Sequence, residues 1–211
     1  MPELGFCCTG AVAEPYAASP SLLFTLRVSE ATGVRMHTVA LRCQLRIEPH
    51  KRRYSANEAS RLTDLFGEPS RWGDTVKPMQ LATVGVMVQG FTESIDVPMP
   101  VPLSADTEVA TGKYFHGLDD GEIPLLMLFS GTAFYQSEAG VQVELVPWHL
   151  EVAHRLPVTV WRQVMDQHFP ASTWLSVRTE THVALQSYRA RRGTLNWDDT
   201  LADLLKRVDG R

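Results

Sequence analysis

The most constraining feature of this chain is a two-residue alternation of apolar and polar side chains within its first 150 residues. The alternation is clearest over residues 22–28 and 39–47, where every second side chain is apolar. Side chains of a β-strand point alternately to opposite faces, so this period predicts strands with one buried and one solvated face. Gly33 lies in the turn between them, and Pro49 ends the second strand because proline cannot donate to a ladder. The two strands suit an antiparallel pair.

Five further segments have the composition of strands. One of them carries proline at alternate positions, which confines it to a sheet edge. The longest apolar run predicts a central strand, and a turn over 137–140 leads from it into a hairpin. The predicted segments are 81–88, 93–101, 109–116, 123–135 and 141–145.

Helical patterns occur once within the strands and then dominate the C-terminal part. Ser55 with Glu58 three residues later forms a capping box, and the helix that it opens stops at Gly67. After Trp148 the apolar period changes from 2 to 3.6. This change predicts three more helices, over 158–169, over 179–191, and from Asn196 or Asp198 to Val208.

A run of strands followed by a run of helices indicates the α+β class. We predict an antiparallel β-sandwich with one inserted helix and a C-terminal α-helical appendage. The expected division places the sandwich in residues 1–150 and the appendage, packed on the sandwich, in 151–211.

Charge and apolar run length exclude several kinds of protein. Twenty basic and 24 acidic residues give a net charge of −4, which argues against a nucleic-acid partner held through phosphates. No stretch of about 18 apolar residues exists, so we expect no membrane insertion. The start Met1–Leu4 lacks the pattern of a signal peptide. Three cysteines, two of them adjacent, disfavour a disulfide framework and fit a cytoplasmic protein.

Metal ligation has only weak candidates. His149 and His154 lie five residues apart around a glutamate, and a nickel or zinc site there is one interpretation. Surface histidines are the simpler one. Cys7 or Cys8 would join Cys43 in a soft-metal site if the first strand paired with the third, whereas buried inert thiols are the simpler interpretation. We therefore expect no metal and no cofactor.

Catalytic motifs are missing, because neither a nucleophile elbow nor a phosphate-binding loop occurs. Asp119 and Asp120 precede a glycine, and they serve either as calcium ligands and acid–base groups or as a solvated turn. In the loop Arg71–Asp74, Trp72 is either a plug on the sheet or an exposed anchor for a partner, flanked by Arg71 and Asp74. We take Arg71, Trp72, Asp74, Asp119 and Asp120 as the candidate partner-binding or ligand-binding residues.

Two larger groups of side chains admit a functional and a structural interpretation. A basic set on and after one strand would bind an acidic partner or simply solvate a sheet face. A tryptophan set at the junction of the two halves is expected to attach the helices to the sandwich. The basic set is Arg27, Arg42, Arg46, Lys51, Arg52 and Arg53, and the tryptophans are Trp148, Trp161 and Trp174.

Several stretches resemble an uncharacterised bacterial domain-of-unknown-function family that is common in actinobacteria. They include Glu14–Ala17, Leu41–Pro49, Arg53–Ser55, Leu65–Gly67, Arg71–Thr75, Leu118–Leu125, Leu128–Thr132 and Val146–Trp148. Members are typically encoded beside uptake nickel–iron hydrogenase genes. The resemblance implies an accessory, assembly or structural role around the hydrogenase, and it transfers no functional residue.

Our leading hypothesis is a non-catalytic accessory or scaffold protein that contacts a protein partner, such as a hydrogenase subunit. A metallochaperone or maturation factor using His149, His154 and the cysteines is the first alternative. A small-ligand or carbohydrate-binding sandwich using Trp72 with Asp74 or Asp119 is the second.

Overall fold

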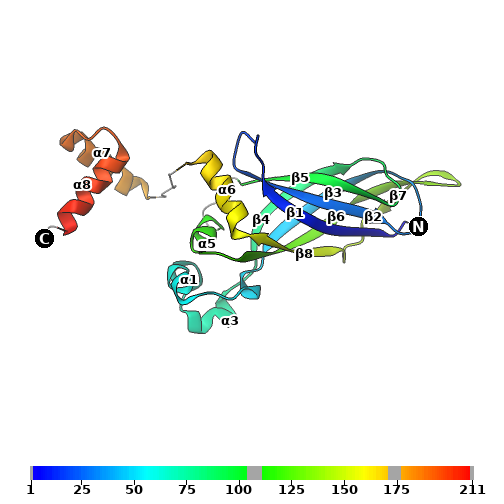
Figure 1. The fold of residues 1–211 in the computed structure, drawn as a ribbon, viewed down its shortest axis with the longest axis horizontal. Coiled ribbons are helices and arrows are strands. Elements are labelled where there is room, and N and C mark those ends of the chain that lie inside the picture. The colour runs from blue at the N-terminus through cyan, green and yellow to red at the C-terminus, as the bar shows by residue number, and fades with distance from the viewer. Residues whose placement is uncertain (1, 104–110, 171–176, 210–211) are drawn as a thin grey trace. The chain divides into compact units, whose positions relative to one another are not determined.

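The computed structural model describes residues 2–103, 111–170 and 177–209 (Figure 1). The chain divides into two compact units, Met1–Ala171 and Ser172–Arg211. The expected division lay at 150/151. Strand β8 (Glu151–Pro157) and helix α6 (Val158–His168) instead belong to the first unit, because β8 completes a sheet.

The described strands of the first unit form two antiparallel sheets. Sheet A has the order β1-β2-β5, with β1 at Leu4–Ala13, β2 at Ser21–Glu30 and β5 at Ser94–Pro102. Alternate residues of β2 are buried as its sequence period predicted. Strand β5 pairs with β2 alone and turns its prolines to solvent, which confirms its predicted edge position.

Sheet B has the order β4-β3-β6-β7. Strands β7 and β8 pair with the same edge of β6, β8 with its first half and β7 with its second half. The predicted central strand is confirmed, because β6 has neighbours on both sides. The bounds in this sheet are Met36–Ile47 for β3, Met79–Val88 for β4, Glu122–Ser137 for β6 and Gly140–Leu145 for β7.

The core lies between the two sheets, so the predicted sandwich is confirmed. The Phe6 and Phe129 rings stack across it with centroids 4.4 Å apart. Leu26 and Cys43 are fully buried. Each sheet contributes one apolar face to this interior, as the period-2 pattern requires.

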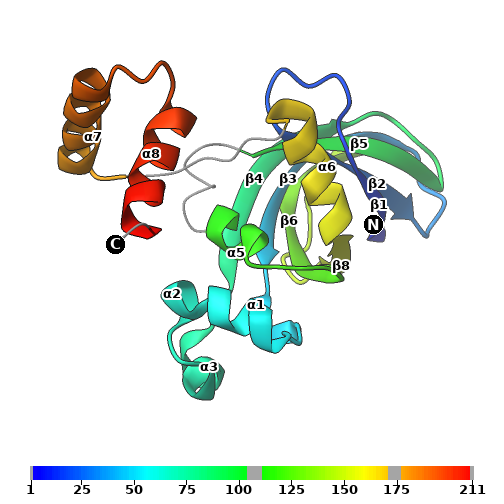
Figure 2. The same cartoon turned by 60° about the vertical axis from the view of Figure 1, so that its left-hand side comes forward.

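The inserted segment between β3 and β4 folds into short helices at one end of the sheets, near α5 (Figure 2). The capping box at α1 (Ala56–Arg61) is confirmed. Leu62 and Phe66 bury the apolar side of the segment. Its other helical turns are η1 (Pro49–Lys51), α2 (Thr63–Phe66), η2 (Pro69–Arg71) and α3 (Trp72–Thr75).

The expected strand over 109–116 is wrong where the structure describes it. Lys113–His116 is the helix α5, while 104–110 lie outside the described residues. Tyr114 and Phe115 are adjacent and both buried. A strand would send adjacent side chains to opposite faces, and a helical turn lets both enter the core.

The predicted tryptophan cluster is not formed by the described residues. Trp161 of α6 is 4% exposed, whereas Trp148 is 89% exposed. Trp174 lies outside the described part of the chain. The contact between α6 and the sheets therefore depends on Trp161 with Val158 and Val164, which are fully buried.

The second unit contains the two remaining predicted helices, α7 (Thr179–Arg192) and α8 (Trp197–Asp209). The Asn196 side chain accepts the Asp199 N–H at 2.7 Å and so caps α8, as one of the two predicted starts requires. Tyr188 of α7 donates to the Asp203 carboxylate of α8 at 2.6 Å. None of the helices described is both long and apolar enough to cross a bilayer.

Candidate functional site

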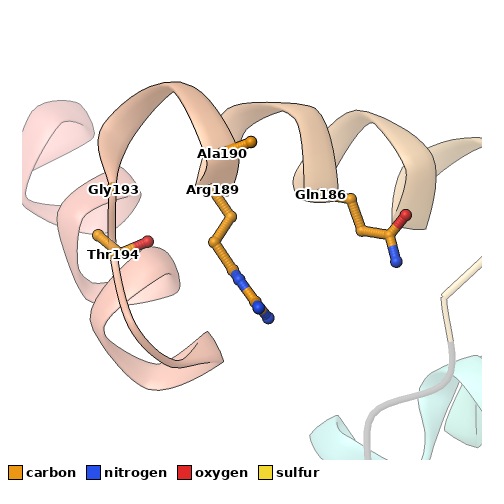
Figure 3. A pocket seen from close by; sticks show the side chains of 5 residues that line it. All are labelled: Gln186, Arg189, Ala190, Gly193 and Thr194. Atoms are coloured by element: carbon orange, nitrogen blue, oxygen red, sulfur yellow. The ribbon is translucent and has the colours of Figure 1, made fainter.

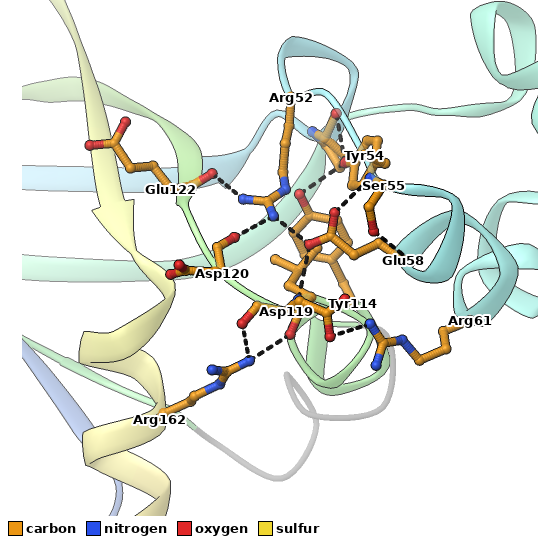
Figure 4. Close-up of polar contacts among 12 residues, drawn as sticks. Arg52, Tyr54, Ser55, Glu58, Arg61, Tyr114, Asp119, Asp120, Glu122 and Arg162 are labelled. Atoms are coloured by element: carbon orange, nitrogen blue, oxygen red, sulfur yellow. Dashed lines mark hydrogen bonds and ion pairs between the residues drawn. The ribbon is translucent and has the colours of Figure 1, made fainter.

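The densest polar cluster of the described residues centres on Arg52 and Glu58 (Figure 4). Arg52 donates from Nη2 to Glu58 Oε1 at 2.6 Å, and the two side chains are 8% and 6% exposed. The same guanidinium donates to the carbonyls of Glu122, at 2.7 Å, and Asp120. Arg52 therefore ties the helical insertion to the turn that precedes β6. We call this set of contacts the arginine clasp.

Glu58 accepts hydrogen bonds from three sides. The N–H groups of Ser55 and Asp119 both donate to its carboxylate at 2.9 Å, in addition to Arg52. Burial alone raises the pKa of this carboxyl, but these hydrogen bonds outweigh it and hold the pKa of Glu58 below its usual range. The buried carboxylate is therefore charged and is held by three protein donors.

Aromatic rings close the clasp on one side. The Tyr54 and Tyr114 hydroxyls lie 3.0 Å apart, and Tyr54 also contacts the Pro49 carbonyl at 2.7 Å. Burial raises the pKa of both phenols. Neither hydroxyl ionises at neutral pH, so the pair contributes packing and hydrogen bonds.

Trp72 packs within the helical insertion, since its described ring and hydrogen-bond contacts are with residues of that insertion and not with a sheet. Its half-buried ring meets Tyr54 and Phe66 edge-on, with centroids 5.1 and 5.5 Å apart, and its indole N–H donates to the Gly67 carbonyl at 2.8 Å. The loop expected around it is the helical turn α3. Arg71 and Asp74, on either side of Trp72, are both exposed. No described contact joins either of them to Asp119 or Asp120.

The turn at Asp119 and Asp120 is held mainly through its backbone. Arg162 of α6 donates to the carbonyls of Leu118, at 2.9 Å, and Asp119. The Asp119 carboxylate pairs with Arg61 at the surface, and this hydrogen bond lowers its pKa. Three arginines thus hold this turn in place, two from the helical insertion (Arg52 and Arg61) and one from α6 (Arg162).

The candidate metal ligands lie apart. His149 is exposed beside Trp148, whereas His154 is half-buried on β8 with its ring edge 5.8 Å from Phe24. Burial lowers the pKa of His154. Among the described residues no three histidine, cysteine, aspartate or glutamate side chains gather closely enough to hold a metal ion.

Cys8 and Cys43 behave as apolar side chains, whereas Cys7 is exposed and departs from the expected buried thiol. Strand β1 pairs with β2 and not with β3, so the pairing that would have joined Cys7 or Cys8 to Cys43 is absent from the described sheets. Burial raises the pKa of Cys8 to about 11 and that of Cys43 to about 12. Thiols with such pKa values are neutral and poor metal ligands at pH 7.

The second unit carries an open pocket of about 430 Å³ at the end of α7 (Figure 3). Its lining includes Gln186, Arg189 and Thr194, and Gly193 adopts φ +65° there to end the helix. The Arg189 guanidinium also lies 4.9 Å from the Trp197 ring centroid. The Arg189 cation thus already interacts with Trp197 of the same unit.

The outer face of sheet B carries an apolar surface that sequence reasoning missed. In one row across the sheet, Leu145 pairs with Thr132, Thr132 with Ala40, and Ala40 with Met87. Leu145 is 73% and Met87 67% exposed. We define the outer band as Ala40, Met87, Phe134, Val141, Val143 and Leu145, which the strand registers place on this face.

The outer band was missed because alternation shows which residues share a face but not which face is covered. On β7 the valines and leucine point outward, while Gln142 and Glu144 share the side of buried Ala133. This orientation reverses the usual pattern. The only clue in the sequence is that β7 is short and follows a strand longer than its neighbours.

Arg42 borders the outer band. It lies two residues after Ala40 on β3, on the same face, and is exposed. Within the described part of the chain no carboxylate pairs with it. The predicted basic face is otherwise broken up, because Arg52 is buried in the clasp and Lys51 pairs with Glu48.

The whole sequence, residues 1–211, matches the model of a family described as a family of unknown function, DUF6084. The chain belongs to this family. The family assignment agrees with the resemblance to a domain-of-unknown-function family and adds no activity. No curated protein matches the chain.

Solved structures similar to this DUF6084 member include β-glucosidase 3B from Thermotoga neapolitana in complex with α-D-glucose, at 10% identity and a TM-score of 0.27. A β-glucosidase from Kluyveromyces marxianus aligns at 6% identity and a TM-score of 0.26. The alignments cover 73% of this chain but only 17% and 15% of the two enzymes. The chain thus spans less than a fifth of either, and likeness at these TM-scores carries no information on activity.

Proposed function

We propose that this chain is a non-catalytic accessory protein that binds a protein partner through the outer band. The carrying observation is that apolar side chains from β3, β4, β6 and β7 share the outer face of sheet B, where Met87, Val141, Val143 and Leu145 are exposed and Ala40 and Phe134 are half-buried. Contiguous apolar patches on a protein surface usually mark interaction sites. The arginine clasp supports the proposal, because its buried Arg52 and Glu58 charges are paired with each other and bonded to backbone groups of the fold.

The chemistry of the surface selects the kind of partner. Its centre is apolar, and Arg42 supplies an uncompensated positive charge at its border. A complementary partner presents apolar side chains with a carboxylate at the matching edge. We further propose a cytoplasmic partner belonging to a nickel–iron hydrogenase or its assembly machinery, for which the support is the family resemblance described above.

The two alternatives receive less support from the described residues. A metallochaperone requires converging ligands, and within the described residues no three potential ligand side chains gather. A carbohydrate-binding sandwich requires an open aromatic platform, and the Trp72 ring packs against Tyr54 and Phe66.

Affinity purification from cells that express the hydrogenase tests the proposal. Met87→Glu places a carboxylate in the outer band at a largely exposed position, so the fold should survive while capture falls at least tenfold. Val12→Glu is the matched control, because Val12 is an exposed valine on β1 of sheet A, 54% exposed.

Hydrogenase subunits captured equally by both variants would place the interaction elsewhere on the chain. Purification of the unmodified protein without any hydrogenase component would remove the proposed partner. Circular dichroism of each variant ensures that a lost interaction reflects the surface and not unfolding.

A further inference from the structure

Strand β7 leaves one of its edges unpaired. It bonds to β6 on one side, and none of the described strands pairs with the other side. The β6–β7 hairpin projects beyond the neighbouring strands (Figure 1). Proteins protect such an edge with lysine, proline or a bulge, or by a short strand and an inward charge, and of these β7 has its short length and Glu144. Residues 140–145 contain no lysine or proline, and the β6–β7 register runs without a shift.

The direction of the backbone groups on β7 follows from one hydrogen bond. The N–H of Val146 donates to the Gly131 carbonyl of β6 at 3.0 Å. Antiparallel strands alternate, so every second residue directs both its N–H and C=O toward the partner strand. Val141, Val143 and Leu145 therefore direct their N–H and C=O groups toward the open edge.

We propose that β7 pairs antiparallel with β7 of a second copy of this chain, about a two-fold axis through Val143. Val143 then faces its own counterpart, and Val141 faces Leu145 of the second copy at both ends. These are the residues whose backbone groups point outward, so each pair exchanges both backbone hydrogen bonds. The same patch meets itself, as a two-fold interface requires.

Side chains on the other face of β7 fit the same register. Gln142 lies opposite Glu144 of the second copy, and the two-fold axis repeats this pair. These are non-hydrogen-bonded pairs, in which opposite side chains approach most closely. Glu144 Oε2 is buried and has no hydrogen-bond partner within the described residues. An amide thus faces a carboxylate at both of these positions, and no like charges face each other.

Neighbouring registers are less favourable. A two-fold axis at Val141 would set Glu144 opposite Glu138 of the second copy, which brings two carboxylates together. An axis at Leu145 would set Val143 opposite Pro147, which has no N–H to donate. Of these three registers, only the one through Val143 avoids both costs.

This pairing goes beyond the partner proposed above and does not depend on it. Val141, Val143 and Leu145 keep their side chains on the outer face when the edges pair. Two outer bands then join into one surface, and sheet B continues from one copy into the next.

The mass of the full chain in solution, measured by sedimentation equilibrium over a range of concentrations, tests the pairing. The unmodified chain should be a dimer. Gln142→Glu should make it monomeric by setting carboxylates opposite Glu144. Adding Glu144→Gln to that variant exchanges the two partners and should restore the dimer, a rescue that general destabilisation would not produce.

A backbone variant provides an independent check. Val143→Pro removes an outward N–H without removing a hydrogen bond to β6 and should abolish the dimer, whereas Val143→Thr keeps the N–H and should remain dimeric. Circular dichroism confirms that each variant is folded. A monomeric unmodified chain at every concentration, a dimer insensitive to Gln142→Glu or Val143→Pro, or a double variant that stays monomeric would each overturn the proposal.

Discussion

Gly131 of β6 lies against the backbone of Ala40 on β3, so closely that an added Cβ would meet the Ala40 carbonyl oxygen at 2.1 Å. Its φ of +153° is also rare for residues with a side chain. The two sheet strands at the centre of sheet B can approach in this way only because position 131 is glycine.

Replacing this glycine should therefore destabilise the sheet. We expect Gly131→Ala to lower the free energy of unfolding by about 3 kcal/mol, because the backbone of β3 must shift. Gly85→Ala is the control, since nothing lies within 4 Å of its added Cβ. Urea denaturation should show a change within about 1 kcal/mol for the control, and equal losses for both would contradict the proposed close approach.

The arginine clasp predicts a second large effect. Arg52→Leu leaves the Glu58 carboxylate buried without its cation, and breaking a buried pair costs about 3–5 kcal/mol. The control is Arg27→Leu, which breaks the Arg27–Asp96 pair. Those side chains are 52% and 46% exposed, so its loss should be at most about 1 kcal/mol. If Arg52→Leu and Arg27→Leu lowered the denaturation midpoint by the same amount, the buried pair would stabilise the fold no more than the exposed pair does.

Much of the sandwich could be predicted from sequence because most strands bury one face. Alternation identified β2, β3 and β5, and the apolar length of β6 indicated its central position. The capping box of Ser55 and Glu58 fixed the start of α1. These features are local, and local patterns are what a single sequence displays.

The errors arise where tertiary contacts override local pattern. Strand β8 was missed because polar His154 takes an inward position between Val152 and Leu156, which hides the alternation of the segment. Arg52 was placed on a solvated basic face, since its bonds to Asp120 and Glu122 connect positions far apart in sequence. The exposure of the outer band depends on which side of sheet B is covered, and no periodicity contains that information.

Acid should weaken the fold through Glu30. Burial raises the pKa of this carboxyl, but hydrogen bonds from Thr32, Glu3 and Val34 outweigh it and lower the pKa from 4.5 to about 2. Since the folded-state pKa is the lower one, this contribution to stability is complete above about pH 4.5 and is lost as the pH falls through about 2.

Comparison with Glu30→Gln checks this assignment. The variant should be less stable than the unmodified chain at pH 7, and the difference should narrow as the pH falls from 4.5 toward 2. Stability measured by denaturant titration at several pH values would refute the assignment if the difference stayed constant.

Truncating the Trp72 side chain should destabilise the fold, whereas truncating Trp148 should leave the stability almost unchanged. Trp72→Ala removes two ring contacts and an indole hydrogen bond, and we expect a loss of about 2 kcal/mol for this half-buried side chain. Trp148→Ala should change stability by no more than about 0.5 kcal/mol, because that ring is 89% exposed. Thermal unfolding of both variants distinguishes a plug from a surface anchor.

The register of β3 and β4 has a consequence for engineering the chain. Ile47 pairs directly with Met79, so the polypeptide leaves the sheet and re-enters it at adjacent points. A segment attached in this way can change in length without shifting the strands on either side, provided that Arg52 and Glu58 keep their contacts and Tyr114 stays shielded from water.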